Sequence, residues 1–243
     1  MNRFFSNTSG PALLALLLIG CADQSPPDAP STDARVDAVF KEFEAPGSPG
    51  ASVAVVRDGA VIHAAGYGLS DLGAGSPLTP ATPVRLASVS KAFMSAAIMI
   101  LEADGVLAFD HPAVQWVPEL ASFPGITVRH LMTHTSGIAE YYDEDTVLSL
   151  AVDADGDSVI TNSEAAAVYE GWGEPVTAPG TEFSYSNSGY EMLALIIERA
   201  SGTSVREFLS ERIFKPLEMS ASDVREMPST DILGGAVGYR PSE

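Results

Sequence analysis

The stretch RLASVSKAF, residues 85–93, places a lysine among small and apolar side chains in a chain that has only three lysines. From Ser88 to about Ala103 apolar residues recur with the helical period on nearly every side. Gly105 follows as a typical stop signal for a helix. The pattern therefore predicts a buried helix at the centre of its domain. The presence of Lys91 in it is either chemical or accidental, and the rest of the chain must decide.

The sequence around this helix predicts a hairpin first and further helices after it. ASVAVVRDGAVIHAAGYG, residues 51–68, reads as two strands joined at Asp58-Gly59, a strong short hairpin signal. We expect the folded part to begin near Val36. Shorter helical patterns cover residues 128–133, 190–200 and 205–214. This order favours the α+β class.

Composition and charge restrict the function. The 243 residues carry a formal net charge of −19, which argues against nucleic acid or an anionic membrane surface as partner. The length suits one large domain or two small ones. Cys21 is the only cysteine, so the chain can form no intramolecular disulfide and no cysteine-based metal cluster.

The N-terminus reads MNRFFSNTSGPALLALLLIGC, with an apolar run too short to span a bilayer. Its last four residues, Leu18 to Cys21, resemble a bacterial lipobox, although an ordinary secretory signal with an incidental cysteine is the alternative. We expect residues 1–21 to be a lipoprotein signal peptide whose Cys21 is lipidated. The polar, proline-rich residues 22–35 then form a flexible tether, and the protein is anchored to a membrane of the bacterial cell envelope.

Ser88 and Lys91 lie three residues apart, so on a helix their side chains share one face. The first turn of a helix is the positive end of its dipole. Desolvation in an apolar wall disfavours a charged lysine, and a neutral amine can take a proton from serine. The pair therefore indicates a nucleophile and its base, whereas a chance occurrence of the spacing is the plain alternative.

A second polar stretch is FSYSNSGY, residues 183–190. Tyr185 supplies a phenol that can pass protons, and Asn187 an amide that can hold a substrate carbonyl or the lysine. A surface turn rich in serine, asparagine and glycine is the other interpretation. Both stretches in this order favour a catalytic site.

Four segments resemble the serine β-lactamase and penicillin-binding-protein family, most closely class C β-lactamases with their esterase and peptidase relatives. They are RLASVSKAF, LMTHTSGI (131–138), PGTEFSYSNSGY (179–190) and IFKPLEM (213–219). The similarity runs from about Val36 to Arg240. It implies an antiparallel sheet flanked by helices beside an all-helical domain, with the site at their junction.

The resemblance also implies roles for individual residues. Ser88 would be the acylated nucleophile and Lys91 its base. Tyr185 would pass protons to the leaving group and activate the deacylating water, while Asn187 would orient the substrate amide. The implied activity is hydrolysis of an amide, ester or β-lactam bond in a small molecule or peptide, without a catalytic cofactor. His134 in THTSG belongs to a segment that is mainly structural in relatives.

One element of the family is not found. Relatives carry a Lys/His-Ser/Thr-Gly triplet on a late strand that lines the cleft and supplies one oxyanion donor, and nothing after Tyr185 fits it. Losing such a donor typically costs about 10²–10³ in rate. We therefore expect residues 36–243 to be an incomplete hydrolase domain that lacks the C-terminal strands. A non-catalytic or inactive module of the same family is the alternative.

The stretch DADGDSVITNSE, residues 153–164, aligns with a calcium-binding EF-hand loop. An acidic solvated loop is the other interpretation, and Ser158 replaces the usual glycine at the sharp turn. The expected oxygen ligands of a structural Ca²⁺ are Asp153, Asp155, Asp157, Val159, Thr161 and Glu164.

Overall fold

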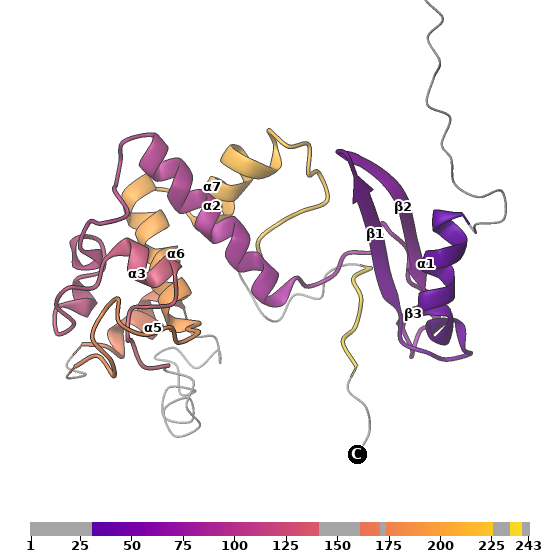
Figure 1. Ribbon diagram of the computed structural model, residues 1–243, viewed down its shortest axis with the longest axis horizontal. Coiled ribbons are helices and arrows are strands. Elements are labelled where there is room, and N and C mark those ends of the chain that lie inside the picture. Colours follow the sequence, from indigo (N-terminus) through magenta and orange to yellow (C-terminus); the bar gives the residue numbers. More distant parts are fainter. Residues whose placement is uncertain (1–30, 141–160, 171–173, 226–233, 240–243) are drawn as a thin grey trace, which may run out of the picture. The chain divides into compact units, whose positions relative to one another are not determined.

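The computed structural model describes residues 31–140, 161–170, 174–225 and 234–239, and the chain divides into two compact units (Figure 1). The first unit ends at Pro80 and the second begins at Ala81. Among the described residues the strands belong to the first unit, whereas helices build the second. These helices and small antiparallel sheets confirm the α+β class.

The first unit is built on the hairpin that the sequence predicts. Strands β1 (Ala51–Arg57) and β2 (Ala60–Tyr67) pair antiparallel, and Ala51 faces Tyr67 in the register. Asp58 and Gly59 form the turn with φ angles of 50° and 77°, the left-handed values that a tight hairpin turn requires. The short strands β3 (Leu69–Asp71) and β4 (Ser76–Pro77) form a second antiparallel pair.

A helix precedes the hairpin and corrects the expected start of the folded part. Helix α1 (Thr32–Phe40) begins at Thr32 rather than near Val36, and the Ser31 hydroxyl caps its first turn. Residues 32–35, which the sequence assigns to the tether, are therefore helical. The composition of this segment is polar, so its own apolar pattern could not indicate the helix.

Helix α1 and strand β2 lie side by side (Figure 1), and polar side chains connect them. The Asp33 carboxylate lies 2.7 Å from His63 Nδ1, and the Tyr67 hydroxyl donates to Asp37 at 2.7 Å. His63 Nε2 also lies 3.1 Å from the Tyr67 hydroxyl, and the Phe40 ring stacks on the Tyr67 ring. Burial and the Asp37 hydrogen bond raise the pKa of Tyr67 to about 12. These long-range contacts stabilise α1 in addition to its Ser31 cap.

The second unit packs its helices around α6 (Ser188–Ser201), in which eight residues are buried. Helices α2, α3, α5 and α7 all pack against it. Gly202 ends α6 with a φ of 74°, a left-handed value that glycine adopts readily. The other described helices of this unit are η2 (Ala87–Val89), α2 (Ser90–Ala103), η3 (Ala113–Gln115), η4 (Pro118–Leu120), α3 (Val128–Met132), α5 (Asn162–Ala167), α7 (Val205–Leu209) and the π-helical η5 (Ser210–Phe214). In the first unit the 3₁₀ helix η1 (Lys41–Glu44) follows α1.

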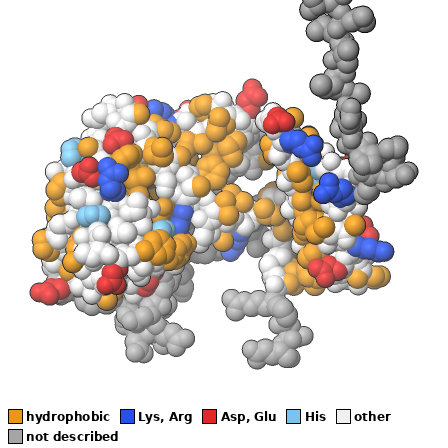
Figure 2. All heavy atoms as spheres, in the orientation of Figure 1, with side chains coloured by type: hydrophobic (Ala, Val, Ile, Leu, Met, Phe, Trp, Pro, Cys, Tyr) orange, Lys and Arg blue, Asp and Glu red, His pale blue; other side chains and the backbone are white. Residues whose placement is uncertain are grey.

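Helix α2 differs from the prediction of a fully buried central helix. Only Ala97, Ile98 and Leu101 are buried, whereas Val89 just before the helix and Met99 within it are 62% and 57% exposed. In the described part of the chain α2 packs on α6 and α7 along one side only, so its other side stays uncovered. Figure 2 shows hydrophobic side chains at many places on the visible face of the described residues. Within the described ranges, no helix has the length and apolar character to cross a bilayer.

Candidate active site

Ser88 lies in the single 3₁₀ turn η2, two residues before α2 begins. The helix therefore starts later than the sequence predicts. Ala87 has a φ of 45°, a strained value for a residue with a side chain, and this bend directs the chain into the turn. Ser88 is exposed, and its hydroxyl still faces Lys91 because the 3₁₀ turn continues directly into the helix.

The partly buried Lys91 joins the two polar stretches. Its Nζ donates to Asn187 Oδ1 at 2.7 Å and lies 3.5 Å from Ser88 Oγ. The same nitrogen lies 4.9 Å from the Tyr185 ring centre and 5.4 Å from that of Tyr190. The Ser88 contact is at the long limit of a hydrogen bond, a distance often seen in catalytic pairs before substrate binds. The amide and the two rings thus aim the amine at the hydroxyl.

Tyr185 completes this group of side chains. The neighbouring Lys91 amine and Ser88 hydroxyl lower the pKa of its phenol, in that order. The residue is 46% exposed, so its hydroxyl is accessible from solvent as well. A phenol in contact with both the serine and the lysine can pass a proton between them or to a leaving group.

The structure thus brings together Ser88, Lys91, Tyr185 and Asn187, the four catalytic and substrate-binding residues that the sequence analysis selected. Asn187 contacts the lysine, one of the two partners considered for it.

Two further residues support the site and were missed. The Tyr190 hydroxyl donates to the carbonyl of Met132 at 3.0 Å and lies 2.9 Å from Ser95 Oγ. It therefore connects α6 with α2 and α3 beneath Lys91. The helical spacing offered a signal, because Ser95 is one turn after Lys91 and Tyr190 follows Asn187 by three residues.

The segment THTSG holds the loop that carries Tyr185. Gly137 has a φ of 72°, and a Cβ atom there would lie 2.1 Å from the carbonyl oxygen of Thr177. Only glycine meets both conditions. The carbonyl of Gly137 accepts from the amide of Val176, and that of Thr135 accepts from Gly180. This backbone pairing explains why the segment belongs to the same site.

Four of the six predicted calcium ligands lie outside the described residues: Asp153, Asp155, Asp157 and Val159. Thr161 and Glu164 are described and form a capping box at the start of α5. Glu164 Oε2 accepts from the amide and the hydroxyl of Thr161, each at 2.8 Å. Among the described residues there is no group of three side chains arranged to hold a metal ion. Cys21 also lies outside the described ranges.

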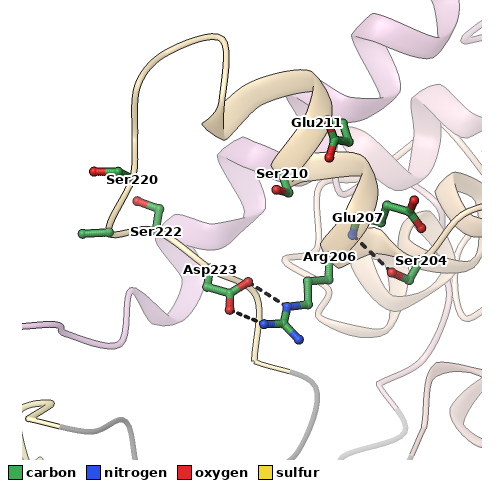
Figure 3. Close-up of a pocket in the computed structure, with 9 residues that line it drawn as sticks. Ser204, Arg206, Glu207, Ser210, Glu211, Ser220, Ser222 and Asp223 are labelled. Atoms are coloured by element: carbon green, nitrogen blue, oxygen red, sulfur yellow. Dashed lines mark hydrogen bonds and ion pairs between the residues drawn. The ribbon is translucent and has the colours of Figure 1, made fainter.

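A polar hollow elsewhere in the second unit has a different character (Figure 3). Arg206 forms a two-pronged ion pair with Asp223 there, and the hydroxyl of Ser204 caps α7 (Figure 3). Its lining contains no lysine, histidine or tyrosine that could act as base to a serine. The lining residues are Ser204, Arg206, Glu207, Ser210, Glu211, Ser220, Ala221, Ser222 and Asp223.

The serine–lysine–tyrosine geometry agrees with comparisons to known proteins. The family described as Beta-lactamase matches residues 36–240 of the chain. The chain belongs to the β-lactamase family. It is 31% identical over 191 residues to a D-aminopeptidase from Brucella anthropi, an alignment that covers 79% of this chain and 35% of that protein.

Solved structures of related proteins are also similar to this chain in sequence and in fold. The octameric penicillin-binding protein homologue from Pyrococcus abyssi is 34% identical with a TM-score of 0.64, covering 76% of this chain and 43% of that one. D-amino acid amidase from Ochrobactrum anthropi SV3, in complex with L-phenylalanine amide, is 26% identical with a TM-score of 0.69, covering 85% and 57%. The chain thus spans about a third to three fifths of the length of these proteins.

Proposed function

We propose that the chain is a serine hydrolase of the β-lactamase family that forms an acyl-enzyme at Ser88. The observation that carries the proposal is the position of Lys91, whose Nζ reaches Asn187 and Ser88 while facing the Tyr185 ring. These residues come from two separate stretches of the chain, and each contributes a group that acyl transfer needs: a nucleophile, a base, a proton donor and an amide for orientation.

In the proposed reaction the neutral amine of Lys91 takes the hydroxyl proton of Ser88 as Oγ attacks the carbonyl carbon of the substrate. The tetrahedral intermediate then collapses, the bond to the leaving group breaks, and Tyr185 delivers a proton to that group. A water molecule then gives a proton back to Tyr185 and attacks the ester carbonyl. The bond to Ser88 Oγ breaks, Lys91 returns its proton to that oxygen, and the carboxylic acid product leaves. Asn187 holds Lys91 in place and offers its amide to the substrate.

For the substrate we propose an amide, ester or β-lactam of a small molecule or peptide. Relatives named D-aminopeptidase and D-amino acid amidase make D-aminoacyl amides the first compounds to test. A non-catalytic module of the same family is the second candidate.

Intact mass after exposure to a fluorophosphonate distinguishes the two candidates. We expect one adduct on the parent chain, none on Ser88→Ala, and one on Ser90→Ala. Ser90 is the matched control because it is an exposed serine two residues away. A folded parent chain without an adduct would favour the non-catalytic module, and an adduct on Ser88→Ala would refute the assignment of the nucleophile.

We also propose that Cys21 anchors the protein to a membrane of the bacterial cell envelope, on the basis of the lipobox-like sequence that ends there. Incorporation of a labelled fatty acid into the parent but not into Cys21→Ala would support the anchor. Equal absence of label from both would refute it.

Finally, we propose that residues 153–164 bind Ca²⁺. The start of α5 directly after Thr161 supports this proposal, because an EF-hand loop also places the beginning of its second helix at its end. Asp153, Asp155, Asp157, Val159, Thr161 and Glu164 would supply the oxygens, and the ion would act in ordering the segment rather than in the reaction.

A further inference from the structure

One residue, His134, binds the backbone on both sides of Tyr185. Its carbonyl oxygen accepts from the amide of Ser184 at 2.8 Å, and its ring Nδ1 accepts from the amide of Ser186 at 3.1 Å. The imidazole also stacks on the Tyr185 ring, with centres 4.5 Å apart and planes 29° apart. The tyrosine is therefore held at three points by a single side chain and its backbone.

The conformation of His134 is adapted to this contact. Its φ of 57° lies in the left-handed region, which few non-glycine residues adopt, most often asparagine, aspartate and histidine. The ring also lies against Phe183 and Tyr190, with centres 5.8 and 5.0 Å away. Strain of this kind persists where surrounding contacts determine the geometry.

The hydrogen bond from Ser186 defines which ring nitrogen carries the proton. A backbone amide only donates, so Nδ1 must present a lone pair and the proton of the neutral ring must be on Nε2. Burial and the charged form of Lys91 lower the pKa of His134, whereas Glu140 raises it to a smaller extent. The net shift favours the neutral ring that the hydrogen bond needs.

We propose that neutral His134 is the positioning residue that holds Tyr185 for proton transfer, and that protonation of its ring releases the loop. This inference rests on the proposed function. A proton on Nδ1 would face the amide proton of Ser186, so the hydrogen bond would be lost. The groups around the ring are Lys91 from α2, Tyr190 from α6, and Tyr185 and Glu140 from loops.

The direct test uses the ring nitrogens of His134 in the ¹⁵N-labelled protein. We expect Nδ1 to be unprotonated at neutral pH, and the amide resonances of Ser184 and Ser186 to shift together with the titration of His134. A protonated Nδ1 at neutral pH, or amides that do not follow the ring, would overturn the inference. This readout needs no enzymatic activity, so it separates a failure of this inference from a failure of the proposed function.

The kinetic test follows the rate of Ser88 labelling by fluorophosphonate against pH. His134→Ala should slow labelling by about 10²-fold, the typical effect of displacing a catalytic group by about 1 Å. His134→Asn should recover most of this loss, because its side-chain oxygen can accept from Ser186 and asparagine tolerates the left-handed backbone. The labelling rate of His134→Asn should also fall less than that of the parent as the pH is lowered from about 7 to 5, where histidine titrates.

His111→Asn is the matched control. His111 Nδ1 accepts a backbone amide too, that of Ala108 at 3.0 Å, but its ring stacks on Trp116 and not on the Tyr185 loop. The labelling rate and pH profile of His111→Asn should equal those of the parent. Equal slowing by His134→Ala and His134→Asn, or an acid limb unchanged in His134→Asn, would refute the positioning role.

Discussion

Replacement of Asn187 by alanine tests the organisation of the site in a single change. The side-chain oxygen of Asn187 accepts from Lys91 at 2.7 Å, and this is a short hydrogen bond to a group that can carry a charge. Bonds of this kind contribute about 1.5–3 kcal/mol. Without it, Lys91 loses the contact that draws its amine toward Ser88, and its long side chain regains freedom.

If the full contribution is expressed in acylation of Ser88, the rate should fall about 10- to 150-fold, since each 1.4 kcal/mol corresponds to about a factor of ten. The assay is the rate of adduct formation with a fluorophosphonate, followed by intact mass. Ser90→Ala provides the control, because Ser90 is exposed at the first residue of α2. A rate within about twofold of the parent, with an unchanged melting temperature, would refute the reasoning that Asn187 positions Lys91.

Three further predictions concern stability and metal binding. The pKa of Tyr67 is raised to about 12 from 10.0, so the unfolded chain loses its phenol proton at a lower pH than the folded state does. The free energy of unfolding should therefore decline between pH 10 and 12. Denaturant titrations should show a weaker decline for Tyr67→Phe, and the same dependence on pH in both proteins would contradict this prediction. Gly137→Ala should destabilise the second unit by more than about 1 kcal/mol in urea unfolding, because its Cβ would lie 2.1 Å from the Thr177 carbonyl oxygen. Gly75→Ala should cost less, because Gly75 has a similar φ but open space around the position of its Cβ. Excess Ca²⁺ should raise the melting temperature of the parent relative to chelator but not that of Asp153→Asn, and equal temperatures for the parent would refute the calcium site.

The elements of this protein were predictable where local rules apply. The hairpin around Asp58-Gly59 follows from two residues that adopt left-handed φ angles, and the end of α6 follows from Gly202. The Ser88–Lys91 pair was also readable, because a spacing of three residues brings side chains together in any helical turn.

Features that depend on distant partners could not be read from the sequence. Helix α1 is stabilised by His63 and Tyr67, about thirty positions away in the chain, and so its start at Thr32 was missed. The centre of the second unit is α6 and not α2, since periodicity reports an apolar face but not what covers it. The contact of His134 with Ser186 spans 52 positions, and no motif spacing indicates it.

The most direct test of the central claim is the location of the covalent adduct. The parent chain would be treated with a fluorophosphonate, digested, and its peptides sequenced by mass spectrometry. The account predicts modification at Ser88 alone, with Lys91→Met abolishing it although the serine remains. Modification at another residue, or labelling of Ser88 that persists undiminished in Lys91→Met, would contradict it.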